Sequence, residues 1–283
     1  MDSCMSPKLF KIPSTDGVQV AVHDYGGNGP AIIFCHATGF HGRYWDSICS
    51  LLLEDFHCVS LDFRGHGDTE TPKGTSMQWM GMAEDLLSVV DHFQFKESFG
   101  VGHSMGGASL LLAEKKRGDV FKSLWLFEPI VIPTGPLVEK LSSGNNLAAS
   151  ARKRNERFPS REDAFQRYAS RPPFSGVDRE ALRSYVDYGF TDHQDGDVIL
   201  KCRGEVEAQV FENSSTGLFD SLPNIKVISK VAGSTDQQGP ALLAPDIAEA
   251  LPNGSYEEFS GMTHFAPMED PKRVAVSINS FFN

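Results

Sequence analysis

The sequence contains no CxxC pair, no HExxH motif and no uninterrupted apolar run long enough to cross a bilayer. Its five cysteines are odd in number and scattered, so we expect neither a disulfide framework nor a zinc site. Positive charge is scarce: 26 Lys and Arg stand against 37 Asp and Glu, a net charge of −11. This balance argues against nucleic acid or an anionic membrane as the main partner.

The first 17 residues, MDSCMSPKLFKIPSTDG, lack the apolar stretch of an export signal. Together with the unpaired cysteines, this predicts a cytoplasmic protein with no membrane insertion. Hydrophobic residues make up 40% of the chain and charged residues 22%, which is enough apolar surface to bury a sizeable core. The sequence gives no indication of the oligomeric state.

The order of apolar runs and helical patterns predicts an α/β fold. Two alternating runs, Leu9–Pro13 and Val18–His23, flank a Thr-Asp-Gly turn and indicate an antiparallel hairpin. Helical patterns at Tyr44–Glu54, Ser76–Phe95 and Ser104–Lys116 separate apolar runs typical of buried strands. These runs are Ala31–Cys35, His57–Phe63, Ser98–Gly102, Ser123–Phe127 and Ile225–Ala232. Such alternation favours a mostly parallel, doubly wound sheet with helices on both faces.

The alternation stops after Pro129 and resumes at Ile225. Between them we find polar helical stretches such as Arg161–Ala169 and Asp178–Tyr188, and no pair of apolar strands. We therefore predict a core formed by residues 1–132 and 223–283, with residues 133–222 inserted as a helical cap over the carboxyl ends of the strands. After the insertion we expect a helix near 242–251, a strand near 256–259 and a last helix at 271–282.

A methionine-rich stripe runs along the second helical pattern. Met77, Met80, Met82, Ala83, Leu86, Leu87 and Val90 recur at helical spacing, which predicts core packing.

The strongest local signal is GHSMGG, residues 102–107, which follows a predicted strand and opens a predicted helix. This is a GxSxG nucleophile elbow in its required context. The glycines suit a crowded turn, where a Cβ would collide with neighbouring backbone. Ser104 is thus the candidate nucleophile. It needs a base, and His264 in GMTHFAP, between the last strand and the last helix, is the candidate.

Four motifs in this order resemble those of α/β-hydrolase-fold serine hydrolases. They are HATGF after the third predicted strand, DFRGHG after the fourth, the elbow, and the loop of His264. HATGF resembles the family's HG-type oxyanion loop, with Ala37 where glycine is usual. The resemblance covers almost the whole chain and implies a Ser-His-acid triad that needs no cofactor and no metal.

Two carboxylates fit the place of the triad acid. Asp236 follows the strand at Ile225–Ala232, the commonest place in the family, and we favour it. Glu128 follows the strand at Ser123–Phe127, where haloalkane dehalogenases and some other relatives carry their acid. Either could orient His264 and stabilise its imidazolium form.

The resemblance also implies an oxyanion hole formed by the backbone N–H groups of Thr38 and Met105, because Met105 follows the nucleophile. Since these donors belong to the backbone, the alanine at position 37 is compatible with the hole. His36 is then expected to brace the loop.

The predicted cap contains a basic cluster, namely Arg152, Lys153, Arg154, Arg157 and Arg161. We interpret it as a solvated helix face, with attraction of an anionic substrate group as the alternative.

These features predict a serine hydrolase that cleaves a small ester, thioester or related acyl compound. Other reactions on the same site stay open, namely C–C bond hydrolysis, lyase chemistry and cofactor-free perhydrolysis, and so does a small-molecule receptor built on the same scaffold. A serine at the elbow argues against dehalogenase and epoxide-hydrolase chemistry.

Overall fold

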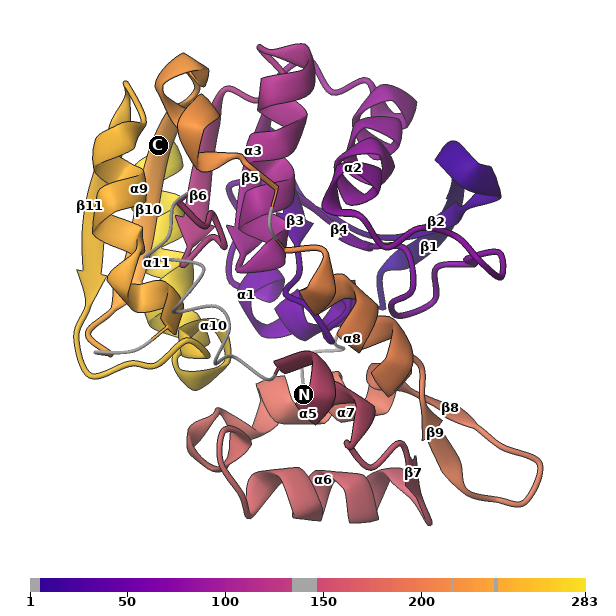
Figure 1. Cartoon of the computed structure of the whole chain (residues 1–283). Helices are drawn as coiled ribbons and strands as arrows, with labels where there is room; N and C mark the ends of the chain where they lie inside the picture. Colours follow the sequence, from indigo (N-terminus) through magenta and orange to yellow (C-terminus); the bar gives the residue numbers. More distant parts are fainter. Residues whose placement is uncertain (1–5, 134–146, 215, 237–238) are drawn as a thin grey trace.

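The computed structural model describes residues 6–133, 147–214, 216–236 and 239–283. Within these ranges an eight-stranded sheet has the order β1-β2-β4-β3-β5-β6-β10-β11 (Figure 1). Its strands are β1 (Lys8–Pro13), β2 (Gln19–Gly26), β3 (Ala31–Cys35), β4 (His57–Asp62), β5 (Ser98–His103), β6 (Ser123–Phe127), β10 (Ile228–Ser234) and β11 (Gly254–Phe259).

The sheet is antiparallel at one edge and parallel elsewhere. β1 pairs with β2, and β2 with β4, in antiparallel register, whereas every pairing from β4 to β11 is parallel. β3, β5 and β6 consist entirely of buried residues, which explains their continuous apolar sequences. The predicted α/β fold and its N-terminal hairpin are confirmed.

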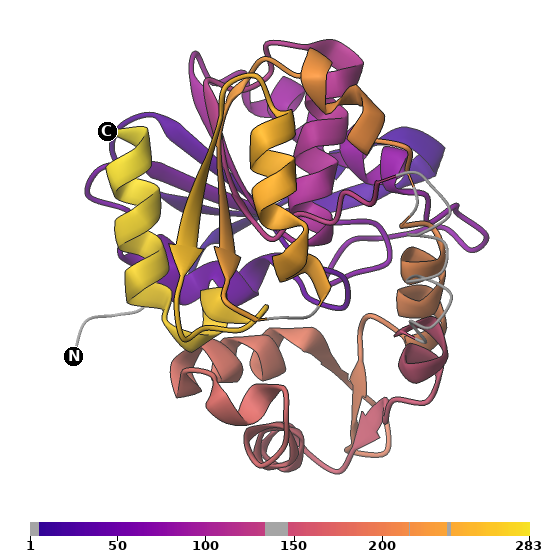
Figure 2. The ribbon, with the colours of Figure 1, turned by 60° about the vertical axis from the view of Figure 1, so that its left-hand side comes forward.

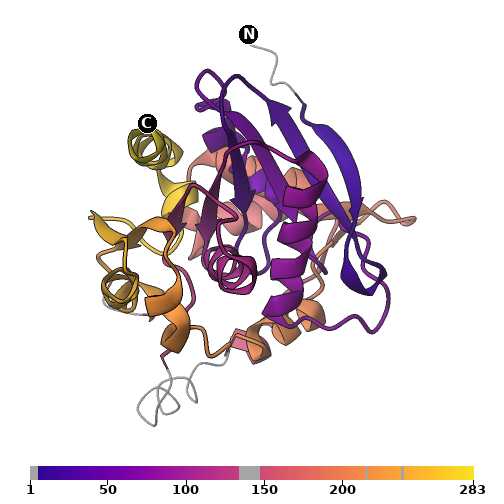
Figure 3. The same cartoon turned by 90° about the horizontal axis from the view of Figure 1, so that it is seen from above.

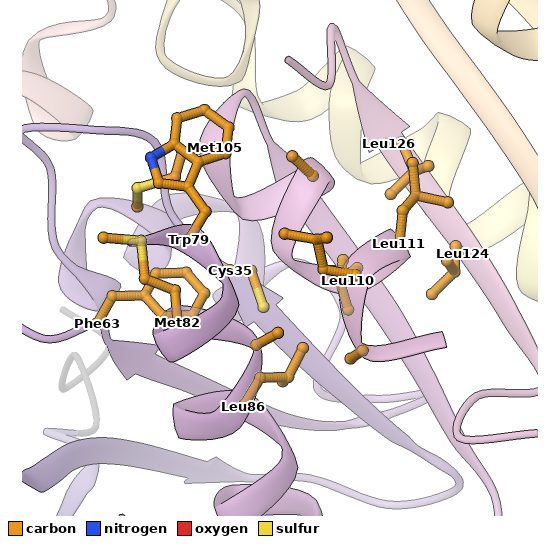
Figure 4. Packing of buried hydrophobic residues seen from close by; sticks show 14 of the residues in the cluster. Cys35, Phe63, Trp79, Met82, Leu86, Met105, Leu110, Leu111, Leu124 and Leu126 are labelled. Atoms are coloured by element: carbon orange, nitrogen blue, oxygen red, sulfur yellow. The ribbon is translucent and has the colours of Figure 1, made fainter. Parts of the chain in front are cut away.

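Helices cover both faces of the sheet (Figure 3). One face packs against α2 (Trp79–Phe93), α3 (Met105–Arg117) and α9 (Ala244–Ala250), and the other against α1 (Asp46–Ser50) and α11 (Pro271–Phe282). On the first face, Leu110 and Leu111 of α3 lie near Leu124 and Leu126 of β6 (Figure 4). These apolar contacts hold α3, and thus the turn that precedes it, against the sheet.

The methionine stripe is mostly core. Met82 and Leu86 are fully buried in α2, and Figure 4 shows Met82 beside Phe63 and Trp79. Met80 is 37% exposed, so its prediction as a core residue is wrong. It lies on the outer face of α2 because successive helical residues point about 100° apart.

A separate group of elements is inserted between β6 and β10. It contains α5 (Leu147–Arg152), α6 (Arg161–Ala169), α7 (Arg179–Gly189) and α8 (Gly204–Glu212). A small antiparallel sheet, absent from our prediction, joins β7 (Arg157–Phe158), β9 (Val198–Leu200) and β8 (Phe190–Asp192). In Figure 2 the arrowheads of β10 and β11 point towards this inserted region, which we call the cap.

Two of the predicted helices are shorter in the structure, because part of each forms a 3-10 turn. The pattern at Tyr44–Glu54 forms a 3-10 turn, Gly42–Trp45, followed by the short α1. The pattern at 242–251 similarly divides into a 3-10 turn, Gly239–Leu242, and α9. None of the helices in the described part of the chain is long and apolar enough to cross a membrane.

The first turn of α3 lies directly on the backbone of β3. A Cβ on Gly106 would lie 2.2 Å from the carbonyl oxygen of Cys35 and 2.7 Å from that of His36. Because these partners are backbone atoms of a buried strand and the loop after it, they cannot move aside cheaply. Gly106 therefore fixes how closely the elbow approaches the end of β3.

We expect Gly106→Ala to lower the free energy of unfolding by at least about 2 kcal/mol, because the added methyl overlaps backbone atoms. Gly176→Ala is the matched control, since a Cβ there would meet no atom within 4 Å. Urea unfolding of both variants checks this, and equal small losses would contradict the close approach.

Candidate active site

Ser104 occupies a strained turn between β5 and α3. Its φ of 57° and ψ of −117° lie outside the regions that residues with side chains favour. The turn is tied to the end of β6: the Ser104 N–H donates to the Phe127 carbonyl at 3.0 Å, and the Ile130 N–H donates to the Ser104 carbonyl at 3.2 Å. Gly102 and Gly107 pack closely there, since a Cβ on Gly102 would lie 2.7 Å from backbone atoms of Gly107. The elbow glycines thus match the crowding that the sequence predicts.

Glu128 follows β6 directly and also has a left-handed backbone, with a φ of 42°. Its N–H donates to the Ala232 carbonyl of the neighbouring strand β10 at 2.9 Å. The side chain is fully buried. One carboxylate oxygen, Oε1, accepts the Ser234 N–H at 2.7 Å, and the other, Oε2, contacts His264 Nδ1 at 2.5 Å.

His264 lies on the loop between β11 and α10 (Ala266–Glu269). The loop is held by Glu269, whose carboxylate accepts hydrogen bonds from the N–H and the hydroxyl of Thr263 at 2.8 and 2.6 Å. The His264 ring lies beside the elbow, with its centroid 4.6 Å from that of His103, the residue before Ser104. A neutral His264 that donates from Nδ1 to Glu128 leaves Nε2 as a proton acceptor.

The carboxylate that contacts His264 is therefore Glu128, and our preference for Asp236 in that place is corrected. Asp236 is exposed, and its N–H contacts Ser234 Oγ at 3.4 Å. Both residues follow strands, but only Glu128 is buried beneath the loop of His264. Burial raises the pKa of Glu128, but the hydrogen bonds from His264 and Ser234 outweigh burial and lower it, so the carboxylate is ionised at neutral pH.

The loop after β3, which carries Thr38, starts beside the first turn of α3. His36 holds this loop: its Nε2 accepts the Phe63 N–H at 3.0 Å, so its Nδ1 carries the proton and donates to the Ala37 carbonyl at 2.8 Å. The bracing role expected of His36 is thus confirmed. No hydrogen-bond acceptor for the Thr38 N–H is present among the residues that the structure describes. Met105 is the first residue of α3, where a helix leaves its N–H groups without internal acceptors.

Three aromatic rings from separate segments gather beside these residues. Phe40 of the loop after β3 lies 6.1 Å from Phe174 of the cap, and 6.2 Å from Phe265, which follows His264. Phe174 and Phe265 are 5.5 Å apart, measured between ring centroids. Together they offer an apolar surface next to His264.

The four arginines of the basic cluster in the cap form ion pairs. Arg152 contacts Glu205 and Glu212, Arg157 contacts Asp195 and Asp197, and Arg161 contacts Asp192. The predicted solvated face is wrong for Arg154, which is largely buried and pairs with Glu207. These ion pairs neutralise the four arginines, which disfavours the alternative that they attract an anionic substrate group.

Among the described residues, one group brings three possible metal ligands together, namely His23, Asp62 and Asp68. The carboxylate oxygens of this group already accept hydrogen bonds or form ion pairs within the fold. The Asp62 carboxylate accepts the N–H groups of Gly42 at 2.5 Å and Asp68 at 2.7 Å, while the Asp68 carboxylate pairs with Lys201. Asp62 therefore pins two loops to the end of β4.

The matching family model is that of the "Alpha/beta hydrolase family", over residues 32–277. The chain belongs to the alpha/beta hydrolase family. This α/β hydrolase is 24% identical over 263 residues to the putative non-heme bromoperoxidase BpoC of Mycobacterium tuberculosis, covering 92% of this chain and 96% of that protein. It is 32% identical over 84 residues to 3-oxoadipate enol-lactonase 1 of Acinetobacter baylyi, covering 30% of this chain and only 31% of the lactonase.

Solved structures show the same fold. E-2-(acetamidomethylene)succinate hydrolase superposes on this α/β hydrolase with a TM-score of 0.80 at 19% identity, covering 97% of this chain and 99% of that one. A thermophilic esterase from Thermogutta terrifontis gives a TM-score of 0.73 at 21% identity, covering 97% and 98%. The family and these structural neighbours are hydrolases, including esterases.

Four buried histidines surround the site, namely His36, His41, His66 and His103. Burial lowers the pKa of each, to about 4 for His41. In the unfolded chain a histidine titrates near about 6.5. As the pH falls below that value, these histidines become protonated in the unfolded chain but stay neutral in the folded chain. The free energy of unfolding therefore decreases until the pH reaches their pKa values in the folded state.

We therefore expect the free energy of unfolding to be highest above about pH 6.5 and to fall by about 1.4 kcal/mol per pH unit for each such histidine below it. Melting temperatures at about pH 7.5 and about pH 5.5 check this expectation. An unchanged melting temperature, or titration of the NMR signals of these four imidazoles in the folded protein within this interval, would contradict it.

Proposed function

We propose that this α/β hydrolase is a serine hydrolase that cleaves a small ester, thioester or related acyl compound. Ser104 is the nucleophile, His264 the general base and acid, and Glu128 the acid that orients His264. The observation that carries the proposal is the 2.5 Å contact of Glu128 with Nδ1 of a histidine that lies beside a strained serine elbow.

In the proposed reaction, His264 Nε2 takes the proton as Ser104 Oγ attacks the substrate carbonyl. The tetrahedral oxyanion accepts hydrogen bonds from the Thr38 and Met105 N–H groups. His264 then gives its proton to the leaving group, and water hydrolyses the acyl-enzyme with His264 again as base. The ionised Glu128 stabilises the imidazolium form in both steps.

The surroundings support an acyl substrate with an apolar part. The ring of Phe265 lies 5.9 Å from that of His264 and contacts those of Phe40 and Phe174, so the three rings can pack against an acyl chain. The paired arginines of the cap favour an uncharged substrate over an anionic one. Esterases among the structural neighbours agree with this substrate class.

A second candidate is perhydrolysis, in which hydrogen peroxide replaces water at the acyl-enzyme and a peracid is released. We keep this candidate because the chain aligns over 92% of its length with the putative non-heme bromoperoxidase. Measuring the rate of peracid formation from an ester and hydrogen peroxide, beside the rate of ester hydrolysis, would distinguish perhydrolysis from hydrolysis.

Ser104→Ala should abolish both turnover of 4-nitrophenyl acetate and labelling by a fluorophosphonate, because no other hydroxyl occupies the elbow. Peptide mapping of the labelled wild type should locate the probe on Ser104. A labelled variant, or a probe on another residue, would refute the nucleophile.

Glu128→Gln should lower kcat by about 10³- to 10⁴-fold, because the imidazolium loses its counter-charge and the histidine its orientation. Asp236→Asn is the matched control, an exposed carboxylate close to the same loop, and should keep kcat within about twofold. Initial rates of ester hydrolysis measure both. A large loss in Asp236→Asn with Glu128→Gln unaffected would reverse the assignment.

A further inference from the structure

One cap residue, Tyr185 of α7, touches the loop that carries Thr38 at two points. Its hydroxyl lies 3.3 Å from the Gly39 carbonyl oxygen, and its own carbonyl oxygen lies 3.0 Å from His41 Nε2. Its ring also stacks on that of His41, at 5.7 Å between centroids. The side chain is 1% exposed, so these contacts are made away from water.

The direction of the hydroxyl hydrogen follows from its neighbours. Arg154 Nη2 lies 3.1 Å from the Tyr185 oxygen, and a guanidinium group can only donate. The hydroxyl therefore accepts from Arg154 and donates to the Gly39 carbonyl. Burial raises the pKa of Tyr185, so the hydroxyl keeps this proton at neutral pH.

Arg154 is itself held by Glu207 of α8, which lies flush against the same loop. Arg154 Nη1 donates to Glu207 Oε2. A Cβ on Gly39 would lie 2.4 Å from Glu207 Oε1, so no other residue fits at position 39 without displacing this carboxylate. Gly39 also has a φ of 78°, which favours glycine on its own.

The core holds the opposite side of the same residue. The Gly39 N–H donates to His66 Nε2 at 3.1 Å, and His66 Nδ1 donates to the Arg64 carbonyl at 2.9 Å. The Phe40 N–H closes the turn on the Ala37 carbonyl at 3.1 Å. Gly39, next to Thr38, is thus fixed by the core through its N–H and by the cap through its carbonyl.

We infer that Tyr185 is a positioning residue for the oxyanion loop, with Glu207 and Arg154 orienting its hydroxyl. This inference rests on the proposed function, because it assumes that the Thr38 N–H receives the oxyanion. The cap then contributes to the rate of the chemical step, besides covering the substrate. Small displacements of such a donor matter, because its stabilisation depends on where charge develops in the transition state.

The chain offers a closely matched control. Tyr168 of α6 also accepts from Arg154 Nη2, at 3.3 Å, and packs its ring on Tyr185 at 5.9 Å between centroids. Tyr168→Phe therefore removes the same kind of bond to Arg154, but leaves the contact with Gly39 in place. Comparing the two phenylalanine variants isolates the contact with the loop.

We expect Tyr185→Phe to lower kcat for 4-nitrophenyl acetate, and the rate of fluorophosphonate labelling, by about tenfold, with KM within about twofold. Tyr168→Phe should leave all three within about twofold. Equal losses in the two variants, or a change confined to KM in Tyr185→Phe, would overturn the inference. Wild-type protein that neither turns over the ester nor reacts with the probe would instead refute the proposed function, and the inference with it.

Glu207→Gln gives a second measurement that keeps the tyrosine and the shape of the side chain against Gly39. The loss of charge loosens Arg154, so we expect a fall in kcat of about threefold with KM unchanged. Should Tyr185→Phe not fold, judged by its melting temperature, this variant decides. An unchanged kcat would overturn the inference that Glu207 and Arg154 orient the Tyr185 hydroxyl. A rise in KM with kcat unchanged would overturn the inference that Tyr185 positions the loop of Thr38.

Discussion

The backbone contact between Gly106 and the end of β3 determines where the other parts of the site can lie. Because α3 begins against the carbonyl groups of Cys35 and His36, the loop that follows β3 must pass beside the first turn of that helix. This approach places the first turn of α3 beside the start of the loop that carries Thr38. A side chain at position 106 would separate the two segments, whatever residues they carried.

The neighbouring strands β5 and β6 are each followed by a residue with a positive φ, Ser104 and Glu128. Such conformations are unfavourable for residues with side chains, and persist only where surrounding interactions determine them. Here the backbone of Ser104 is bonded to Phe127 and Ile130, and that of Glu128 to Ala232 of β10. The strained residues thus lie where neighbouring parallel strands are already joined by hydrogen bonds.

Much of this arrangement could be predicted from the sequence, because the relevant signals are local. Continuous apolar runs gave the buried strands, and the glycines around Ser104 gave the elbow. The carboxylate beside His264 could not be decided in this way, since Glu128 and Asp236 both follow strands and differ only in burial. The strands β7, β8 and β9 have two or three residues each, too few for a period to show. The contacts of Tyr185 and Arg154 could not be predicted, because their partners Gly39 and Glu207 are distant in sequence.

The position of Glu128 has a consequence for how this architecture tolerates change. Serine and carboxylate both precede the inserted region, on one continuous stretch that runs from β5 to the end of β6, and only His264 follows it. The insertion can therefore be lengthened, shortened or exchanged without separating the two residues that stand before it. An exchanged cap would keep the contact with the Gly39 carbonyl only if it carried a hydroxyl where Tyr185 now has one.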